Sequence, residues 1–365
     1  MDVWKIRMIS STDRLNELSL IRVLACVGIV ILHTVFAASE YFSGSISSGE
    51  SLASRMIVNN MMWAVPSFVM VTGVLQLDMK KPLTLGKLYT KYIFRIAVAL
   101  VGCCLVFRIF DMIMDGEPFT FGGVMIAFSE LFTGKAWGHL WYLYLLIGLY
   151  VLLPFYRKIV AHCTNGELVY LCGAYFVFVS IIPMIEDFGV PIAFYISESI
   201  IYPLYLFLGY MIHEGRIHIS RYFALGLLVI STAVILGMDI GKLQMGAAIP
   251  EALFGYASPV VIAQTVGVFT LLCAPAAPKA LGPAATAEKK MPGTGSKLIA
   301  LLDRQSFGIY LLHMIFIRLL FRYWGVDPYL TGHGLLLIPI VIGIFLASFI
   351  LTRLLTLIPG VNKVL

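Results

Sequence analysis

Ten long apolar segments constrain the fold of this chain more than any other feature of its sequence. They lie at about residues 19–38, 56–77, 93–111, 139–156, 168–186, 192–212, 222–238, 256–274, 304–324 and 334–356. An α-helix needs about 20 mainly apolar residues to cross a bilayer, where only helices and closed barrels satisfy their own backbone polar groups. The chain is 60% hydrophobic and only 13% charged, whereas soluble domains carry about 25% charged residues. The predicted fold class is therefore an all-α polytopic membrane protein, a bundle of about ten transmembrane helices.

The basic residues predict the orientation of this bundle. With a cytoplasmic N-terminus, 20 of the 26 lysines and arginines fall on the cytoplasmic side and 6 on the outer side, as the positive-inside rule requires. Both termini are therefore expected in the cytoplasm, and the protein in the cytoplasmic (plasma) membrane as a multi-pass protein. The net charge of +6 is accounted for by these loops, so no nucleic-acid partner is predicted.

The organisation between the spans is simple. We expect one membrane-embedded domain over residues 1–365, with a cytoplasmic linker loop at 275–297 that is rich in Pro, Gly, Ala and Lys. Residues 120–138 are expected to form an apolar hairpin or re-entrant piece. None of the six cysteines forms a CxxC pair or lies beside a histidine at metal-ligand spacing, so neither a disulfide framework nor a metal site is predicted.

The first apolar run, residues 20–36, contains two polar side chains, Arg22 near its start and His33 near its end. Eleven steps of about 100° return to nearly the same bearing, so the two share one helix face, roughly 16 Å apart along the axis. Ionisable groups inside a membrane segment are costly and are functional candidates by default. A guanidinium suits phosphate binding, and an imidazole suits proton transfer. The alternatives are that Arg22 is one more positive-inside anchor and that His33 is a hydrogen-bonded structural residue.

Later apolar segments carry further polar side chains at helical spacing, together with one carboxylate. They are His139, Trp141 and Tyr142; Ser306, Tyr310 and His313; and Glu198. We expect them to line the same cavity as His33. The alternatives are interhelical hydrogen-bond partners, interfacial aromatic residues and, for Glu198, an ion pair with Arg108 or Arg318. The outer acids Glu40, Glu50, Asp111, Asp115 and Glu117 are interpreted as solvated loop charges, with contact to a sugar as the alternative.

Six short motifs follow one another along the chain. They are Arg, ten residues, His in the first helix; residues 65–73 (VPSFVMVTG); Lys91 and Arg95; residues 139–143 (HLWYL); residues 202–210 (YPLYLFLGY); and residues 306–313 (SFGIYLLH). Each motif is weak alone, but in this order they resemble the acyltransferase-3 family of integral membrane acyltransferases over nearly the whole chain. Residues 65–73 resemble the family's "VPLFFMLSGY" segment, with Thr72 in place of Ser and Val74 in place of the aromatic residue.

The resemblance implies transfer of an acyl group, usually acetyl, from cytoplasmic acyl-CoA to a hydroxyl or amine of an envelope sugar. Acetyl-CoA, or another short acyl-CoA, is then the co-substrate, and Arg22, Lys91 and Arg95 are expected to hold its nucleotide at the inner face. The extended pantetheine arm is of the same order as the rise of ~16 Å from Arg22 to His33. His33 is the expected catalytic residue, either as general base on the acceptor hydroxyl or as a carrier of the acyl group.

The expected partners are acyl-CoA, an envelope glycan or lipid-linked sugar, and the lipid bilayer, while the oligomeric state is left open. Two other functions fit the composition. One is a transporter of an acylated or anionic solute or glycan, and the other is a membrane scaffold for a glycan-synthesis complex. An inner basic cluster joined by one helix to an imidazole, together with the ordered motifs, favours the acyltransferase.

Overall fold

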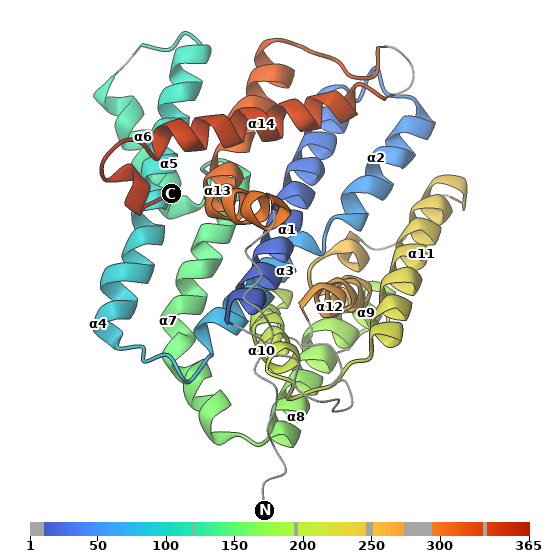
Figure 1. Ribbon diagram of the computed structural model, residues 1–365. Helices are drawn as coiled ribbons and strands as arrows, with labels where there is room; N and C mark the ends of the chain where they lie inside the picture. The colour runs from blue at the N-terminus through green and yellow to red at the C-terminus, as the bar shows by residue number, and fades with distance from the viewer. Residues whose placement is uncertain (1–10, 119, 193–195, 246–250, 274–293, 331–333) are drawn as a thin grey trace, which may run out of the picture. The chain divides into compact units, whose positions relative to one another are not determined.

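The computed structural model describes residues 11–118, 120–192, 196–245, 251–273, 294–330 and 334–365. Within these ranges all regular structure is helical (Figure 1). The helices of the first half are α1 Ser11–Tyr41, α2 Ser48–Asn60, α3 Ala64–Gln76, α4 Leu85–Lys87, η1 Leu88–Ile93, α5 Phe94–Met114, α6 Phe121–Thr133, η2 Gly138–Leu140 and α7 Trp141–His162. Those of the second half are α8 Asn165–Phe176, η3 Val177–Ile181, α9 Ile182–Asp187, η4 Glu198–Ile200, α10 Tyr202–His213, α11 Arg221–Met245, η5 Glu251–Phe254, α12 Pro259–Cys273, α13 Thr294–Arg318, η6 Leu319–Tyr323, α14 Leu337–Leu355 and η7 Val361–Lys363.

The structure confirms a polytopic, all-helical membrane protein. Among the described residues, eight helical stretches are long and apolar enough to cross a bilayer: Glu17–Tyr41, Ser48–Gln76, Leu85–Met114, Gly138–His162, Asn165–Asp187, Arg221–Leu243, Gly295–Tyr323 and Leu337–Leu355. Each overlaps one of the ten predicted spans. The other two predicted spans, 192–212 and 256–274, contain the shorter helices α10 and α12.

Proline explains why these two helices begin later than hydropathy alone indicated. Pro203 lies in the first turn of α10, and Pro259 is the first residue of α12. Proline favours the first helical turn because its missing N–H is not needed there. Among the described residues, the segments before these prolines contain only the short 3₁₀ helices η4 and η5. The predicted hairpin at 120–138 contains a single 13-residue helix, α6. Most of the predicted loop at 275–297 lies outside the described residues, and its last residues belong to α13.

The chain forms two compact units. Unit 1 consists of Met1–Ile29, Asn59–Gln76 and Thr164–Ser306, and unit 2 consists of Val30–Val58, Leu77–Cys163 and Phe307–Leu365. The long helices α1 and α13 each contribute their first part to unit 1 and their last part to unit 2. The prediction of one functional domain over the whole chain stays a prediction.

Close backbone contact joins α3 and α10 in unit 1. A Cβ atom added at Gly73 would collide with the backbone of Leu206, and one added at Gly209 would collide with the backbone of Met70. Glycine lets membrane helices approach closely, so that packing replaces the hydrophobic driving force that lipid cannot supply. Two glycines from the family-like motifs therefore have a packing role.

In unit 2, α13 packs closely against α14. A Cβ atom at Gly308 would overlap the side chain of Thr352, which is itself buried. Two of the unit's membrane helices also contain π-helical stretches, η1 before α5 and η6 after α13. Single π-helical turns are frequent where a helix carries functional residues, and η6 follows directly on the helix that carries His313.

Candidate functional site

Three histidines from distant parts of the sequence meet in unit 2. His33 Nδ1 lies 2.8 Å from His313 Nε2, and the two rings stack with centroids 5.1 Å apart and planes 16° apart. The ring of His139 meets both edge-on, at 6.4 Å from His33 and 5.4 Å from His313. Helix α1 supplies His33, the short turn η2 supplies His139, and α13 supplies His313.

Backbone oxygens hold two of these rings in place. His313 Nδ1 is 3.2 Å from the carbonyl oxygen of Ile309, one turn earlier in α13, and His139 Nε2 is 3.1 Å from that of Leu311. The hydroxyl of Tyr310 donates to the main-chain oxygen of His139. His139 and His313 are buried, whereas His33 keeps some exposed surface. His33 is therefore the least buried of the three rings.

One buried ring nitrogen of this cluster has no hydrogen-bond partner among the described residues. His139 Nδ1 is buried and accepts no hydrogen bond there. An imidazole whose Nε2–H donates to a carbonyl has a lone pair on Nδ1. This atom is thus able to accept a hydrogen bond from an incoming group.

The structure brings together most of the residues that the sequence pointed to as neighbours of His33. Tyr310 lies 5.8 Å from His139 and 6.1 Å from His313, between ring centroids. Tyr142 meets Tyr310 edge-on at 5.6 Å, and Trp141 adjoins Tyr142 at 6.2 Å. Two residues differ. Ser306 belongs to unit 1, where its hydroxyl donates to the main-chain oxygen of Asp303. Glu198 lies in the short turn η4 rather than in a membrane helix, and its side chain is outside the described part of the structure.

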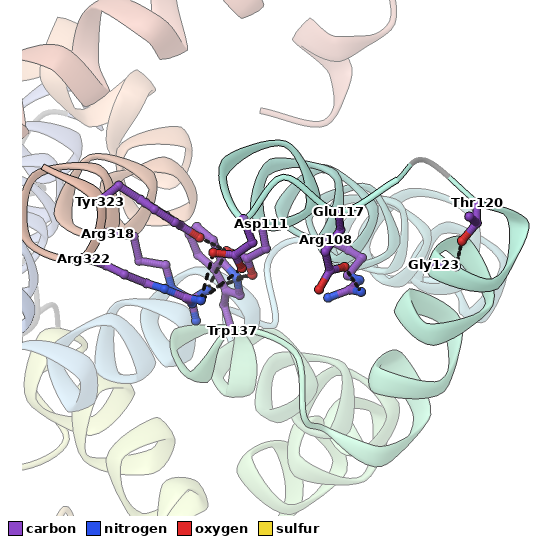
Figure 2. A network of polar contacts seen from close by, with 10 residues as sticks. Arg108, Asp111, Glu117, Thr120, Gly123, Trp137, Arg318, Arg322 and Tyr323 are labelled. Carbon is purple, nitrogen blue, oxygen red and sulfur yellow. Dashed lines mark hydrogen bonds and ion pairs between the residues drawn. The ribbon is translucent and has the colours of Figure 1, made fainter.

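A network of charged and aromatic side chains centres on Asp111 in unit 2 (Figure 2). Arg318 Nη1 donates to both carboxylate oxygens at 2.8 Å, Trp137 Nε1 donates at 2.8 Å, and the hydroxyl of Tyr323 donates at 3.3 Å. The Arg318 guanidinium also lies over the Trp137 ring, 4.0 Å from its centroid. The carboxylate is satisfied by three different side chains, so Asp111 is a structural centre rather than a solvated loop charge.

This network, which we call the Asp111 network, adjoins the histidine cluster. Trp137 stacks on Phe107 at 4.2 Å, and both rings contact His139, at 6.3 and 5.5 Å. Trp137 is also only two residues before His139 in the chain. The Asp111 network therefore fixes the turn that carries His139.

Helical spacing in the sequence contained a signal for this network that we did not use. Asp111 and Asp115 are four residues apart on one helix, and Arg318 and Arg322 are four apart on another. The structure pairs them in register, Arg318 with Asp111 and Arg322 with Asp115. Arg108 pairs with Glu117 at 2.7 Å. Arg108 and Arg318, considered as partners for Glu198, thus have other acidic partners.

Arg22, in unit 1, forms an ion pair that the sequence did not predict. Its Nη2 lies 2.5 Å from Asp303 Oδ2, and Ser19 donates to the same oxygen at 2.7 Å. The Arg22 side chain is 31% exposed and that of Asp303 10%. Arg22 Nε and Asp303 Oδ1 are buried without partners among the described residues. The pair is therefore incompletely satisfied, because each partner keeps one buried polar atom without a hydrogen bond among the described residues.

The two other predicted nucleotide contacts, Lys91 and Arg95, lie in unit 2 on η1 and α5 and are exposed. Arg95 donates at 2.8 Å to the main-chain oxygens of Val364 and Leu365, and it lies over the ring of Phe307 at 5.3 Å. Lys91 lies 5.9 Å from the Tyr92 ring centroid. Lys91 carries its charge at the surface, whereas Arg95 is engaged with the C-terminal residues.

Comparison with known proteins gives one result. A family model described as an acyltransferase domain matches residues 15–357, nearly the whole chain. No curated protein and no solved structure matches the chain. Among the described residues, no group of three or more His, Cys, Asp or Glu side chains has an arrangement that could hold a metal ion. The matched range includes every residue of the histidine cluster, the Asp111 network and the Arg22 pair.

Proposed function

Because the chain belongs to the acyltransferase-3 family, and is therefore a membrane acyltransferase, we propose that it moves an acyl group from cytoplasmic acyl-CoA to a hydroxyl of an extracytoplasmic sugar, polysaccharide or glycolipid. The proposed donor is acetyl-CoA and the proposed location is the cytoplasmic membrane, with both termini inside. The observation that supports this most is the partly exposed imidazole of His33, hydrogen-bonded to the buried imidazole of His313 at 2.8 Å.

The proposed donor site uses Arg22 at the inner end of α1, with Lys91 and Arg95 as further contacts. A CoA phosphate competes with Asp303 for the Arg22 guanidinium, because both are oxyanions that suit the same planar donors. The 31% exposure of the Arg22 side chain leaves room for that exchange. Arg22 and His33 are eleven residues apart on the continuous helix α1, a rise of roughly 16 Å that suits an extended thioester arm.

At His33 the proposed reaction is a proton-coupled acyl transfer. The acceptor oxygen attacks the thioester carbonyl carbon while its proton passes to the imidazole, and the C–S bond breaks as the O–C bond forms. The imidazolium then returns the proton to the departing CoA thiolate. In the second version of this proposal, the ring nitrogen attacks the thioester carbonyl carbon first, and the C–S bond breaks to release CoA thiolate. The acceptor oxygen then attacks the acyl-imidazole, the N–C bond breaks as the O–C bond forms, and the hydroxyl proton passes to the thiolate by way of the released imidazole. Exchange of label between CoA and acyl-CoA without acceptor is expected only in the second version.

Two measurements test the proposal against a transporter or a scaffold. Purified protein is heated with and without acetyl-CoA; a ligand that binds only the folded state raises the apparent unfolding temperature, whereas a scaffold shows no CoA effect. In parallel, acetyl groups on cell-surface glycans are compared between cells with the wild-type chain and with His33→Ala. Loss of acetyl groups from the glycans of cells with the variant supports acyl transfer. An acetyl content that is the same in wild-type and variant cells argues for another function.

A further inference from the structure

The hydrogen bonds of His313 determine which nitrogen of His33 carries the proton. The carbonyl oxygen of Ile309 accepts hydrogen bonds only, so His313 Nδ1, at 3.2 Å, must carry the hydrogen of that contact. A neutral imidazole has one N–H, so His313 Nε2 is then an acceptor. His33 Nδ1, at 2.8 Å from it, must be the donor.

The neutral state of His313 follows from its surroundings. The residue is fully buried, with 0% of its surface exposed. Its hydrogen-bond partners among the described residues are the backbone of Ile309, the backbone of Tyr310 and the ring of His33, and no carboxylate is among them. A buried imidazolium without a carboxylate partner is an unpaired charge, which is costly in a medium of low dielectric. The neutral form with hydrogen on Nδ1 satisfies the contacts with Ile309 and His33 at no such cost.

We propose that His313, oriented by the Ile309 carbonyl, is a positioning residue that holds His33 in the tautomer with hydrogen on Nδ1, so that His33 Nε2 presents the lone pair that reacts. This inference rests on the proposed function for its catalytic meaning. The tautomer itself is a property of the resting protein and does not depend on which acyl group is moved.

The arrangement has the logic of an oriented catalytic histidine. One nitrogen is bound to a fixed acceptor, and the other faces the substrate with a free lone pair. When Nε2 takes a proton or an acyl group, the positive charge is shared with a ring whose Nε2 lone pair already accepts the Nδ1–H. The helix α13 supplies both elements of the support, because Ile309 and His313 are one turn apart.

The experiment uses the full chain in lipid nanodiscs, labelled with ¹⁵N-histidine. Comparison with His33→Gln assigns the His33 signals, and the ¹⁵N shifts show which ring nitrogen bears hydrogen. The expected result for the wild type is hydrogen on Nδ1. His313→Leu removes the acceptor, so His33 should become a mixture of tautomers and acyl transfer should fall about 10²- to 10⁴-fold, as when the group that orients a catalytic histidine is lost.

Two further variants separate positioning from simple packing. His313→Gln keeps a side-chain oxygen that accepts the Nδ1–H, so it should retain the tautomer and recover at least about tenfold of the transfer lost in His313→Leu. His213→Gln alters another buried histidine that contacts a backbone oxygen, in unit 1, and should leave the His33 tautomer unchanged.

Two outcomes overturn the proposal. One is hydrogen on Nε2 of His33 in the wild type, which needs no variant to fold. The other is an unchanged tautomer in His313→Leu. If the tautomer responds as expected but the wild type transfers no acyl group from acetyl-CoA, the positioning role stands and the proposed donor or reaction is wrong.

Discussion

Helix α1 contacts α13 within each unit, and the two contacts differ in kind: one is an ion pair and the other is a hydrogen bond between imidazoles. In unit 1 the contact is a charged pair, Arg22 with Asp303, with the arginine side chain 31% exposed. In unit 2 it is a pair of imidazoles, His33 with His313, closed off by a backbone carbonyl. A partly exposed cation can exchange its carboxylate for a phosphate, whereas a supported imidazole can exchange a proton. Under the proposed function, the Arg22 pair binds the donor and the His33 pair transfers the proton.

Substitution of His33 should give the largest loss of acyl transfer among these variants. His33→Ala removes the least buried ring of the cluster, so acyl transfer should fall by about 10²- to 10⁴-fold, the usual contribution of a positioned acid or base. The affinity for acetyl-CoA, followed by thermal stabilisation, should change by less than about twofold. Product formation that survives at the wild-type rate would remove His33 from the mechanism.

Arg22 should show the reverse pattern. Charge-assisted hydrogen bonds contribute about 1.5–3 kcal/mol, so Arg22→Ala should weaken acyl-CoA binding roughly 10- to 150-fold. Arg22→Lys should recover only part of this, because an ammonium lacks the planar fork of the guanidinium. Titration with acetyl-CoA at constant acceptor measures both variants.

Asp303 provides the matched control for Arg22. Asp303→Asn removes the competing carboxylate, so acyl-CoA affinity should stay the same or rise by up to about tenfold, while thermal stability falls slightly. A change in acceptor affinity alone, in either the Arg22 or the Asp303 variants, would contradict the assignment of this pair to the donor.

The membrane spans and the positions of Arg22 and His33 on one helix could be predicted from the sequence, but the residues that contact Arg22 and His33 could not. A helix needs about 20 mainly apolar residues to cross the bilayer, so the spans were visible as apolar runs. The fixed number of residues per helical turn placed Arg22 and His33 on one helix face. Asp303 and His313 are 281 and 280 residues away from these partners in the chain. Helical periodicity shows which face a residue occupies, but not which distant helix packs on that face. The motif at 306–313 marked His313 as a cavity residue, yet its contact with His33 appears only in the folded chain.

Asp303 also shows that a sequence does not identify the partner of a charged residue. An acid at the start of an apolar segment looks like the boundary of a membrane span, and in the folded chain it is the partner of Arg22. Asp111 was similarly interpreted as an outer loop charge. The sequence shows the matching four-residue spacing of the two arginines, but not that their helix packs against the helix of Asp111. Matching of i, i+4 charges between helices is the step that would have found the Asp111 network.

Substitution of Gly308 tests the histidine cluster through the packing of α13, without a change to any histidine. A methyl group there overlaps the Thr352 side chain, so Gly308→Ala should destabilise the protein by about 1–3 kcal/mol through overpacking and should shift α13 near His313. Transfer should suffer more than acyl-CoA affinity. Gly343→Ala, on the exposed face of α14 where nothing lies within 4 Å, should be neutral or slightly stabilising.

The double variant of Gly308→Ala with Thr352→Ala tests the cause. Removal of the threonine methyl and hydroxyl relieves the overlap, so unfolding temperature and transfer should both recover toward the wild-type values. If the double variant is as damaged as the single one, the loss comes from the flexibility of glycine and not from its close contact with α14.

The smallest effects should come from substitution of Asp111 and Asp115, the carboxylates that pair with Arg318 and Arg322. Both pairs lie in unit 2, so they can be compared directly with each other. Asp111 accepts from Arg318, Trp137 and Tyr323 in a partly buried setting, so Asp111→Asn should cost about 1–2 kcal/mol of unfolding free energy. Asp115→Asn breaks an exposed pair, with side chains 40% and 32% exposed, and should cost less than about 0.5 kcal/mol. Thermal unfolding at low and high salt separates them, because salt screens only the exposed pair. If these charges are structural while the Arg22 pair binds the donor, neither variant changes acyl-CoA affinity. A weakened affinity in Asp111→Asn would mean that the Asp111 network also takes part in donor binding.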